Sequence, residues 1–77
     1  MREWYEVWNT AVGNMIGAFA TEHEALAEVR GLIEVNGADY VDHLALARRR
    51  TDGGDPIASG AELAKLAAEP RPARRTA

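Results

Sequence analysis

Residues 3–9 have the sequence EWYEVWN, and this stretch decides the fold. Aromatic and β-branched residues dominate it, which is typical of a β-strand. Successive residues of a strand point to opposite faces of the sheet, so Tyr5 and Val7 share one face. The opposite face carries Trp4, Glu6 and Trp8. The strand is therefore apolar on both faces, and each face needs a cover.

A hairpin and a helix are predicted next. Residues 9–14 contain Asn and Gly, which favour a turn, and residues 15–20 are the expected antiparallel partner strand. Thr21 stands three residues before Glu24, the spacing of a capping box at a helix start. Gly37 ends this helix, which spans 22–36, because glycine tolerates a positive φ. Its apolar stripe consists of Ala25, Leu26, Val29, Leu32 and Ile33.

The second half of the chain repeats this pattern in shorter form. Residues 40–50 are predicted as a third strand, 51–55 as a turn and 56–59 as a short edge strand, where a proline is tolerated. Residues 60–68 follow as a short helix, and 70–77 as a flexible basic tail. The apolar stripe of the short helix consists of Leu63, Leu66 and Ala67.

These elements predict one α+β domain over residues 1–69 with the order ββαββα. A right-handed crossover places the third strand beside the first, which gives a four-stranded antiparallel sheet in the order 2-1-3-4. The main helix covers one face of this sheet. The face with Trp4, Glu6 and Trp8 is then a partner interface, unless one or both tryptophans are simply core or lie beneath the C-terminal helix.

Composition limits the class of protein. The chain has 77 residues, 47% of them hydrophobic and 27% charged, which is typical of a globular domain. It has no run of about 20 apolar residues for a membrane span and no apolar signal segment after Met1, so a cytoplasmic location is expected. Without cysteine there is no disulfide to stabilise so short a chain, and a homodimer or a complex with another protein is expected.

Charge is unevenly distributed. All Asp and Glu residues lie within residues 1–70. The charged residues of 71–77 are Arg71, Arg74 and Arg75, which are all basic. An acidic body argues against a surface that wraps nucleic-acid phosphates. The abundance of Ala and Arg suggests a GC-rich bacterial genome.

The sequence offers no persuasive catalytic or metal site. His23 and His43 lack the spacing of paired metal ligands, and the DGGD stretch at 52–55 is too short for a phosphate loop. It also has too few oxygen ligands for calcium. We therefore expect no catalytic residue, no metal and no cofactor.

The densest cationic run is Arg48-Arg49-Arg50. Arg48 and Arg50 share one face of the strand, and the run can be a solvated strand end that discourages aggregation. Alternatively, these two arginines contact an anionic partner together with Arg71, Arg74 and Arg75.

The segment at residues 19–25 reads F-x-T-x-x-E-A and leads from a hairpin strand into a helix. With the tryptophan strand before it and a D-G turn after it, it resembles small uncharacterised bacterial ββαββ domains over about residues 4–59. HicB-like antitoxins and the arm-binding domains of tyrosine integrases are similar in part. Antitoxins of that kind continue into a DNA-binding segment, for which little chain remains here. Residues 3–20 contain none of the Arg or Lys with which the arm-binding strands read DNA.

Together these observations predict a small non-enzymatic bacterial interaction or regulatory module, a homodimer through its sheet face. The alternative is a nucleic-acid-linked regulator such as an antitoxin or a transcription accessory factor.

Overall fold

The computed structural model describes residues 3–68. The chain begins with the hairpin of strands β1 (Glu3–Asn9) and β2 (Asn14–Phe19), followed by helix α1 (Glu22–Asn36) and the 3₁₀ helix η1 (Ala38–His43). Strands β3 (Leu44–Arg50) and β4 (Gly53–Ser59) and helix α2 (Gly60–Ala68) complete it. The strands form one antiparallel sheet in the order β2-β1-β3-β4, which confirms the predicted α+β topology.

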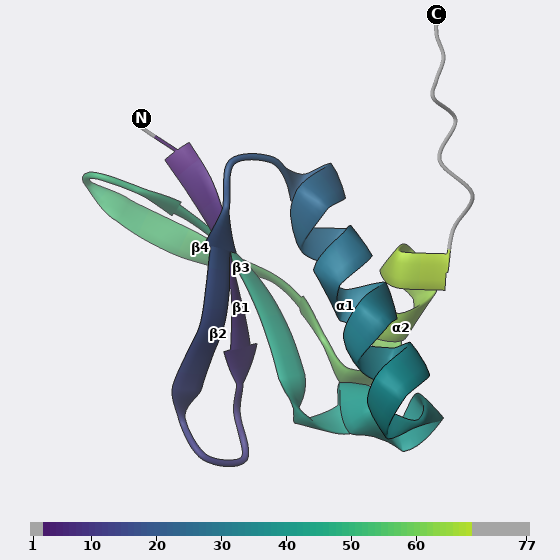
Figure 1. Ribbon diagram of the computed structural model, residues 1–77. Coiled ribbons are helices and arrows are strands. Elements are labelled where there is room, and N and C mark those ends of the chain that lie inside the picture. The colour runs from purple at the N-terminus through teal and green to yellow at the C-terminus, as the bar shows by residue number, and fades with distance from the viewer. Residues whose placement is uncertain (1–2, 69–77) are drawn as a thin grey trace, which may run out of the picture.

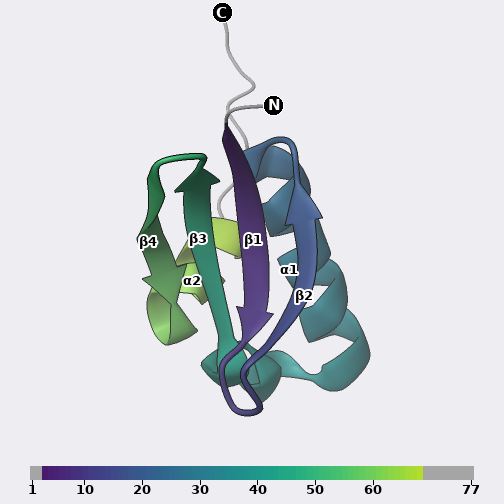
Figure 2. The ribbon, with the colours of Figure 1, turned by 90° about the vertical axis from the view of Figure 1, so that its left-hand side faces the viewer.

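Both α-helices pack on the same face of the sheet (Figure 1). Seen from the opposite side, all four strands lie in front of the helices (Figure 2). The fully buried side chains between the two layers come from every part of the fold: Val7, Leu26, Val29, Leu44, Leu46 and Leu63. The predicted assignment of Val7 to the covered face of β1 is therefore confirmed.

The two ends of α1 follow the predicted capping chemistry. The Thr21 hydroxyl accepts a hydrogen bond from the Glu24 backbone N–H at 3.1 Å, and a Glu24 carboxylate oxygen accepts one from Ala20 N–H at 3.2 Å. At the other end, Gly37 has a φ of 101°, and its N–H donates to the Ile33 carbonyl at 2.7 Å. A residue with a Cβ rarely adopts that φ, so Gly37 fixes where the helix ends.

The prediction that the third strand begins at residue 40 was wrong. Residues 38–43 form η1, and β3 begins at Leu44. The 3₁₀ turn brings Val41, which is 5% exposed, into the core beside the fully buried Leu44, because residues three apart lie on one side of such a helix. A strand through the same residues would send Val41 and Leu44 to opposite faces.

The second hairpin is tighter than predicted. Arg50 pairs with Gly53, so residues 51–52 alone make the turn and β4 starts three residues before the expected edge strand. Glycines disfavour strands in general, but Gly54 has a local role. A Cβ built there would lie 2.6 Å from Cδ of Arg49 and 2.8 Å from the backbone oxygen of Arg48, so glycine makes room for the backbone and the side chain of β3.

Each edge strand contains one β-bulge. The extra residue is Ile16 in β2 and Ile57 in β4, since the pairing skips these positions. Both isoleucines are partly buried against the core. The bulges therefore turn an additional apolar side chain from each edge towards the helices, and they interrupt the regular hydrogen-bonding edge.

Replacing Thr21 by alanine removes the acceptor for the Glu24 N–H. We expect a loss of about 1 kcal/mol in the free energy of unfolding, measured by urea denaturation at fixed protein concentration. Thr10→Ala in the exposed first turn, whose side chain makes no hydrogen bond among residues 3–68, is the matched control and should change stability much less. Equal losses in the two variants would contradict the capping role.

Candidate functional site

The face of the sheet opposite the helices is the candidate site, and we call it the open face. Pairing across the strands identifies its members, because directly paired residues point to the same side. They are Trp4, Glu6 and Trp8 from β1, Met15 and Ala18 from β2, Ala45, Ala47 and Arg49 from β3, and Gly54, Pro56 and Ser59 from β4. The two indoles thus lie among mostly small residues and Met15, and Glu6 and Arg49 are the charged members of this face.

The predicted cluster of Trp4, Glu6 and Trp8 is drawn together by hydrogen bonds. The Trp4 indole N–H donates to Glu6 Oε2 at 2.8 Å, and the Trp8 indole N–H donates to Glu6 Oε1 at 2.9 Å. Each carboxylate oxygen therefore holds one ring. Both indoles remain partly exposed, and neither packs against the buried core.

This arrangement changes the electrostatics of Glu6. Partial burial by itself would raise its pKa, but the hydrogen bonds from Trp4 and Trp8 and the positive charge of Arg49 favour the anion more strongly. The net effect lowers the pKa of Glu6 below its ordinary value. Glu6 is thus held as a carboxylate that satisfies both indole N–H groups, which leaves the carbon surfaces of the rings as the part available for contact.

The position of α2 decides between the two sequence interpretations of the tryptophans. This helix packs on the covered face against β3 and β4, on the same side as α1 (Figure 1). Its buried residues are Leu63 and Ala67, with Leu66 partly buried, as the apolar stripe predicted. Within residues 3–68, no helix lies over Trp4 and Trp8, so they are not core beneath the C-terminal helix.

A hollow of about 330 Å³ lies at the bulge of β4, and its lining joins residues of the open face to Glu62 of α2 on the helix side. Ala45 and Ala47 of β3 form one wall, and Pro56 and Ile57 of β4 form another. Ala45 is the direct neighbour of Trp8 across the sheet.

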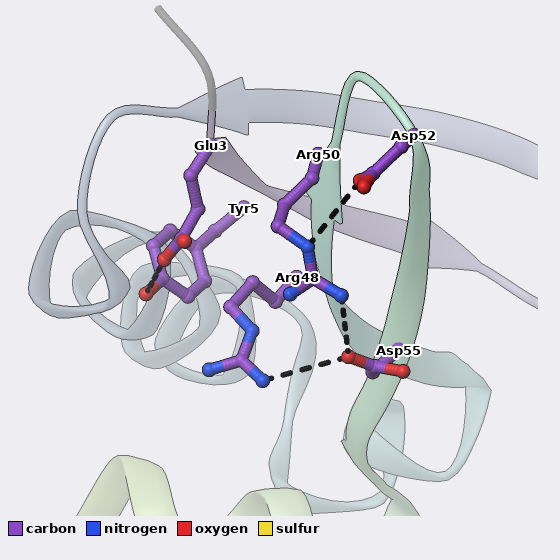
Figure 3. A network of polar contacts seen from close by, with 6 residues as sticks. All are labelled: Glu3, Tyr5, Arg48, Arg50, Asp52 and Asp55. Carbon is purple, nitrogen blue, oxygen red and sulfur yellow. Dashed lines mark hydrogen bonds and ion pairs between the residues drawn. The ribbon is translucent and has the colours of Figure 1, made fainter.

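The other predicted cluster lies at the turn end of the second hairpin, on the covered side of the sheet. Arg48 and Arg50 converge on one carboxylate oxygen of Asp55, at 3.5 and 3.4 Å, and Arg50 also reaches Asp52 at 3.6 Å (Figure 3). Arg48 and Arg50 therefore share one side of the strand, as predicted. The acids of the DGGD stretch act here as their counterions.

Tyr5 and Glu3 extend this polar cluster onto β1. The Tyr5 hydroxyl donates to Glu3 Oε2 at 3.1 Å (Figure 3), and register pairs Tyr5 with Arg48 across the sheet. Burial raises the pKa of Tyr5, and the hydrogen bond to Glu3 adds to this effect, so the hydroxyl stays a donor. The ion pairs lie between side chains that are 40 to 85% exposed, and such pairs contribute little stability each.

Sequence reasoning put forward Arg48 and Arg50 but missed Arg49. Arg49 lies on the open face, where it pairs with Trp4 on one side and Gly54 on the other. The alternation of side chains along a strand, which separated Trp4 from Tyr5, also puts Arg49 on the face opposite Arg48 and Arg50. What the sequence did not contain was the register that sets β3 against β1 and β4.

The remaining candidates do not converge. Among residues 3–68, no three His, Asp or Glu side chains group as a metal site. His43 contacts Tyr40 edge to face, with ring centroids 6.2 Å apart. The same part of the chain has no helix long and apolar enough to cross a membrane. The predicted tail of residues 70–77, with Arg71, Arg74 and Arg75, lies outside the described residues.

Comparisons of the chain with protein-family models, with curated proteins and with solved structures found no match. The open face therefore stands on its own geometry as the evidence for function.

The hydrogen bonds to Glu6 predict a pH dependence of stability. The ordinary pKa of Glu6 is 4.5, and its pKa in the folded state is lower. The stabilisation from ionised Glu6 is therefore complete above pH 4.5, and it is lost as the pH falls through the folded-state pKa. We expect the difference in free energy of unfolding between wild type and Glu6→Gln to shrink as the pH falls below 4.5. Urea denaturation at a series of pH values and one protein concentration measures it.

The variant Trp8→Phe serves as the comparison for this experiment, since it keeps an aromatic ring and removes one N–H donor to Glu6. In that background the pH-dependent part of the Glu6→Gln difference should be smaller. A difference that stays constant from neutral to acid pH would contradict the assigned role of the indole hydrogen bonds.

Proposed function

We propose that this protein is a small non-enzymatic interaction module that works as a homodimer, with the open face as its interface. The observation that carries the proposal is the pair of partly exposed tryptophans, held by Glu6 on a sheet face that no described helix covers. The composition that suggested a bacterial source, and the expected cytoplasmic location, belong to the same proposal.

The chemistry of the open face suits protein contact. Tryptophan is enriched among the residues that dominate interface energies, above all where it meets a pocket and small neighbours. Among the residues around the indoles, Met15, Ala18, Ala45, Ala47 and Pro56 have side chains without N–H or O–H groups. Covering them removes apolar area from water without leaving side-chain donors or acceptors unpaired.

The edges of the sheet are less suited to association than its face. β4 contains Pro56, which has no N–H to donate, and it is bulged at Ile57. β2 is bulged at Ile16. Proline and bulges are features that discourage strands from pairing edge to edge, so we place the contact on the face.

The size of the domain gives a reason for association. The fully buried side chains are few, and a chain of this length without cysteine has little else to stabilise it. Burying the open face adds apolar contact that a single copy lacks. The arginines at the hairpin turn are less suited to an anionic partner, because Arg48 and Arg50 already contact Asp55.

Oligomeric state tests this proposal. We expect wild-type protein to sediment as a dimer at micromolar concentration, with a melting temperature that rises with protein concentration. Ala18→Glu places a second carboxylate beside Glu6 on the open face at an exposed position, and it should shift the protein to monomer. Tryptophan emission should move to longer wavelength as the wild-type dimer dissociates on dilution.

The matched control is Val35→Glu. Val35 is an apolar residue on α1 that is 83% exposed and lies on the helix side of the sheet. The same new side chain at that position should leave the dimer intact. A wild-type monomer at micromolar concentration that melts cooperatively, or equal effects of the two substitutions, would refute the proposed interface.

A further inference from the structure

Glu6 limits what can cover the open face. Its two oxygens each accept one indole hydrogen bond, and a carboxylate offers about four acceptor positions, so acceptor capacity remains. An occupant that sealed this anion from water without a cation would pay a large desolvation penalty. An occupant that brings a positive charge over Glu6 avoids this penalty.

The chain itself carries that charge on the same face. Arg49 is exposed, and it is the only cationic side chain that strand pairing assigns to the open face within residues 3–68. None of the ion pairs in this part of the chain involves Arg49, whereas both of its neighbours contact Asp55. Its side chain passes over Gly54 towards β4, while its charge still lies near enough to Glu6 to favour the carboxylate form.

We propose that two copies of the chain pack open face to open face, so that Arg49 of each copy contacts Glu6 of the other. This inference rests on the proposed homodimer and adds how the two sheets are aligned, which we call the register of the dimer. The contact is reciprocal because an interface with two-fold symmetry uses the same patch on both subunits.

The positions of the two residues allow this packing. Glu6 pairs with Ala47 across the sheet, and Arg49 lies two residues farther along β3 on the same side. A two-fold axis between the sheets, passing midway between Glu6 and Arg49, places each carboxylate opposite the partner's guanidinium. Packed sheets lie about 10 Å apart, a gap that a glutamate and an arginine can span together.

The same register explains the small residues around the pair. Ala47 and Gly54 flank Arg49 on the open face and do not rise above the sheet, so the arginine can reach outward. A guanidinium can also form two parallel hydrogen bonds to a carboxylate, which fixes orientation as well as charge. Glu6 then has two functions, holding the indoles and selecting a partner surface that carries Arg49.

The first test reverses the charge at residue 49. Arg49→Glu sets two carboxylates against each other at both symmetric contacts, and we expect the dissociation constant of the dimer to rise by more than about tenfold in sedimentation experiments. Lys65→Glu makes the same change in charge on the exposed side of α2 and should leave the constant within about twofold.

The second test keeps Glu6 intact. In Arg49→Lys, a carbodiimide can couple the new amine to a carboxylate that it touches, and mixing isotope-labelled with unlabelled chains identifies links between copies. We expect an interchain link between residue 49 and Glu6. Arg48→Lys, whose side chain lies on the other face beside Asp55, should give no such link to Glu6.

The outcomes separate this inference from the proposed function. A dimer that gives no interchain link to Glu6 in Arg49→Lys, or one in which Arg49→Glu behaves like Lys65→Glu, overturns the register but not the dimer. A monomeric wild-type protein overturns both. The interchain link together with the selective loss in Arg49→Glu supports the register.

Discussion

The structure depends on one constraint: a central strand that is apolar on both faces lies in a sheet whose helices all pack on one side. Val7 of β1 and Leu46 of β3 lie on the face that the helices cover, and both are fully buried. Trp4 and Trp8 alternate with Tyr5 and Val7 along β1, so they lie on the opposite face, which no described helix covers. Because side chains of a strand alternate, no shift of β1 within its own plane could bury both sets under the same helices.

Glu6 provides hydrogen-bond acceptors for both tryptophans on the uncovered side of β1. A lone carboxylate between two tryptophans would weaken an apolar surface, but here it accepts both indole N–H groups and so satisfies the only polar atoms of the rings. The cost is a partly dehydrated anion, stabilised by those donors and by the nearby charge of Arg49. The proposed reciprocal contact extends this compensation to the assembled state.

The turn end of the second hairpin shows the opposite solution. There the charged side chains pair within the chain, since Arg48 and Arg50 contact Asp52 and Asp55, and only Nε of Arg48 is buried without a partner among the described residues (Figure 3). The two bulges likewise turn Ile16 and Ile57 towards the core and interrupt the sheet edges. Of the described surfaces that the sequence singled out, the open face is the one whose large apolar side chains are left without a cover.

Local patterns in the sequence determined the strand β1, the two helices with their apolar stripes, the cap at Thr21 and the stop at Gly37, because each depends on neighbours a few residues apart. They also separated Trp4 and Trp8 from Val7. Only the tertiary structure decided that residues 38–43 form a 3₁₀ turn, that β4 begins at Gly53 and that α2 joins α1 on one face. It also placed Arg49 on the face of Glu6, because register and layer order arise from contacts between segments far apart in the chain.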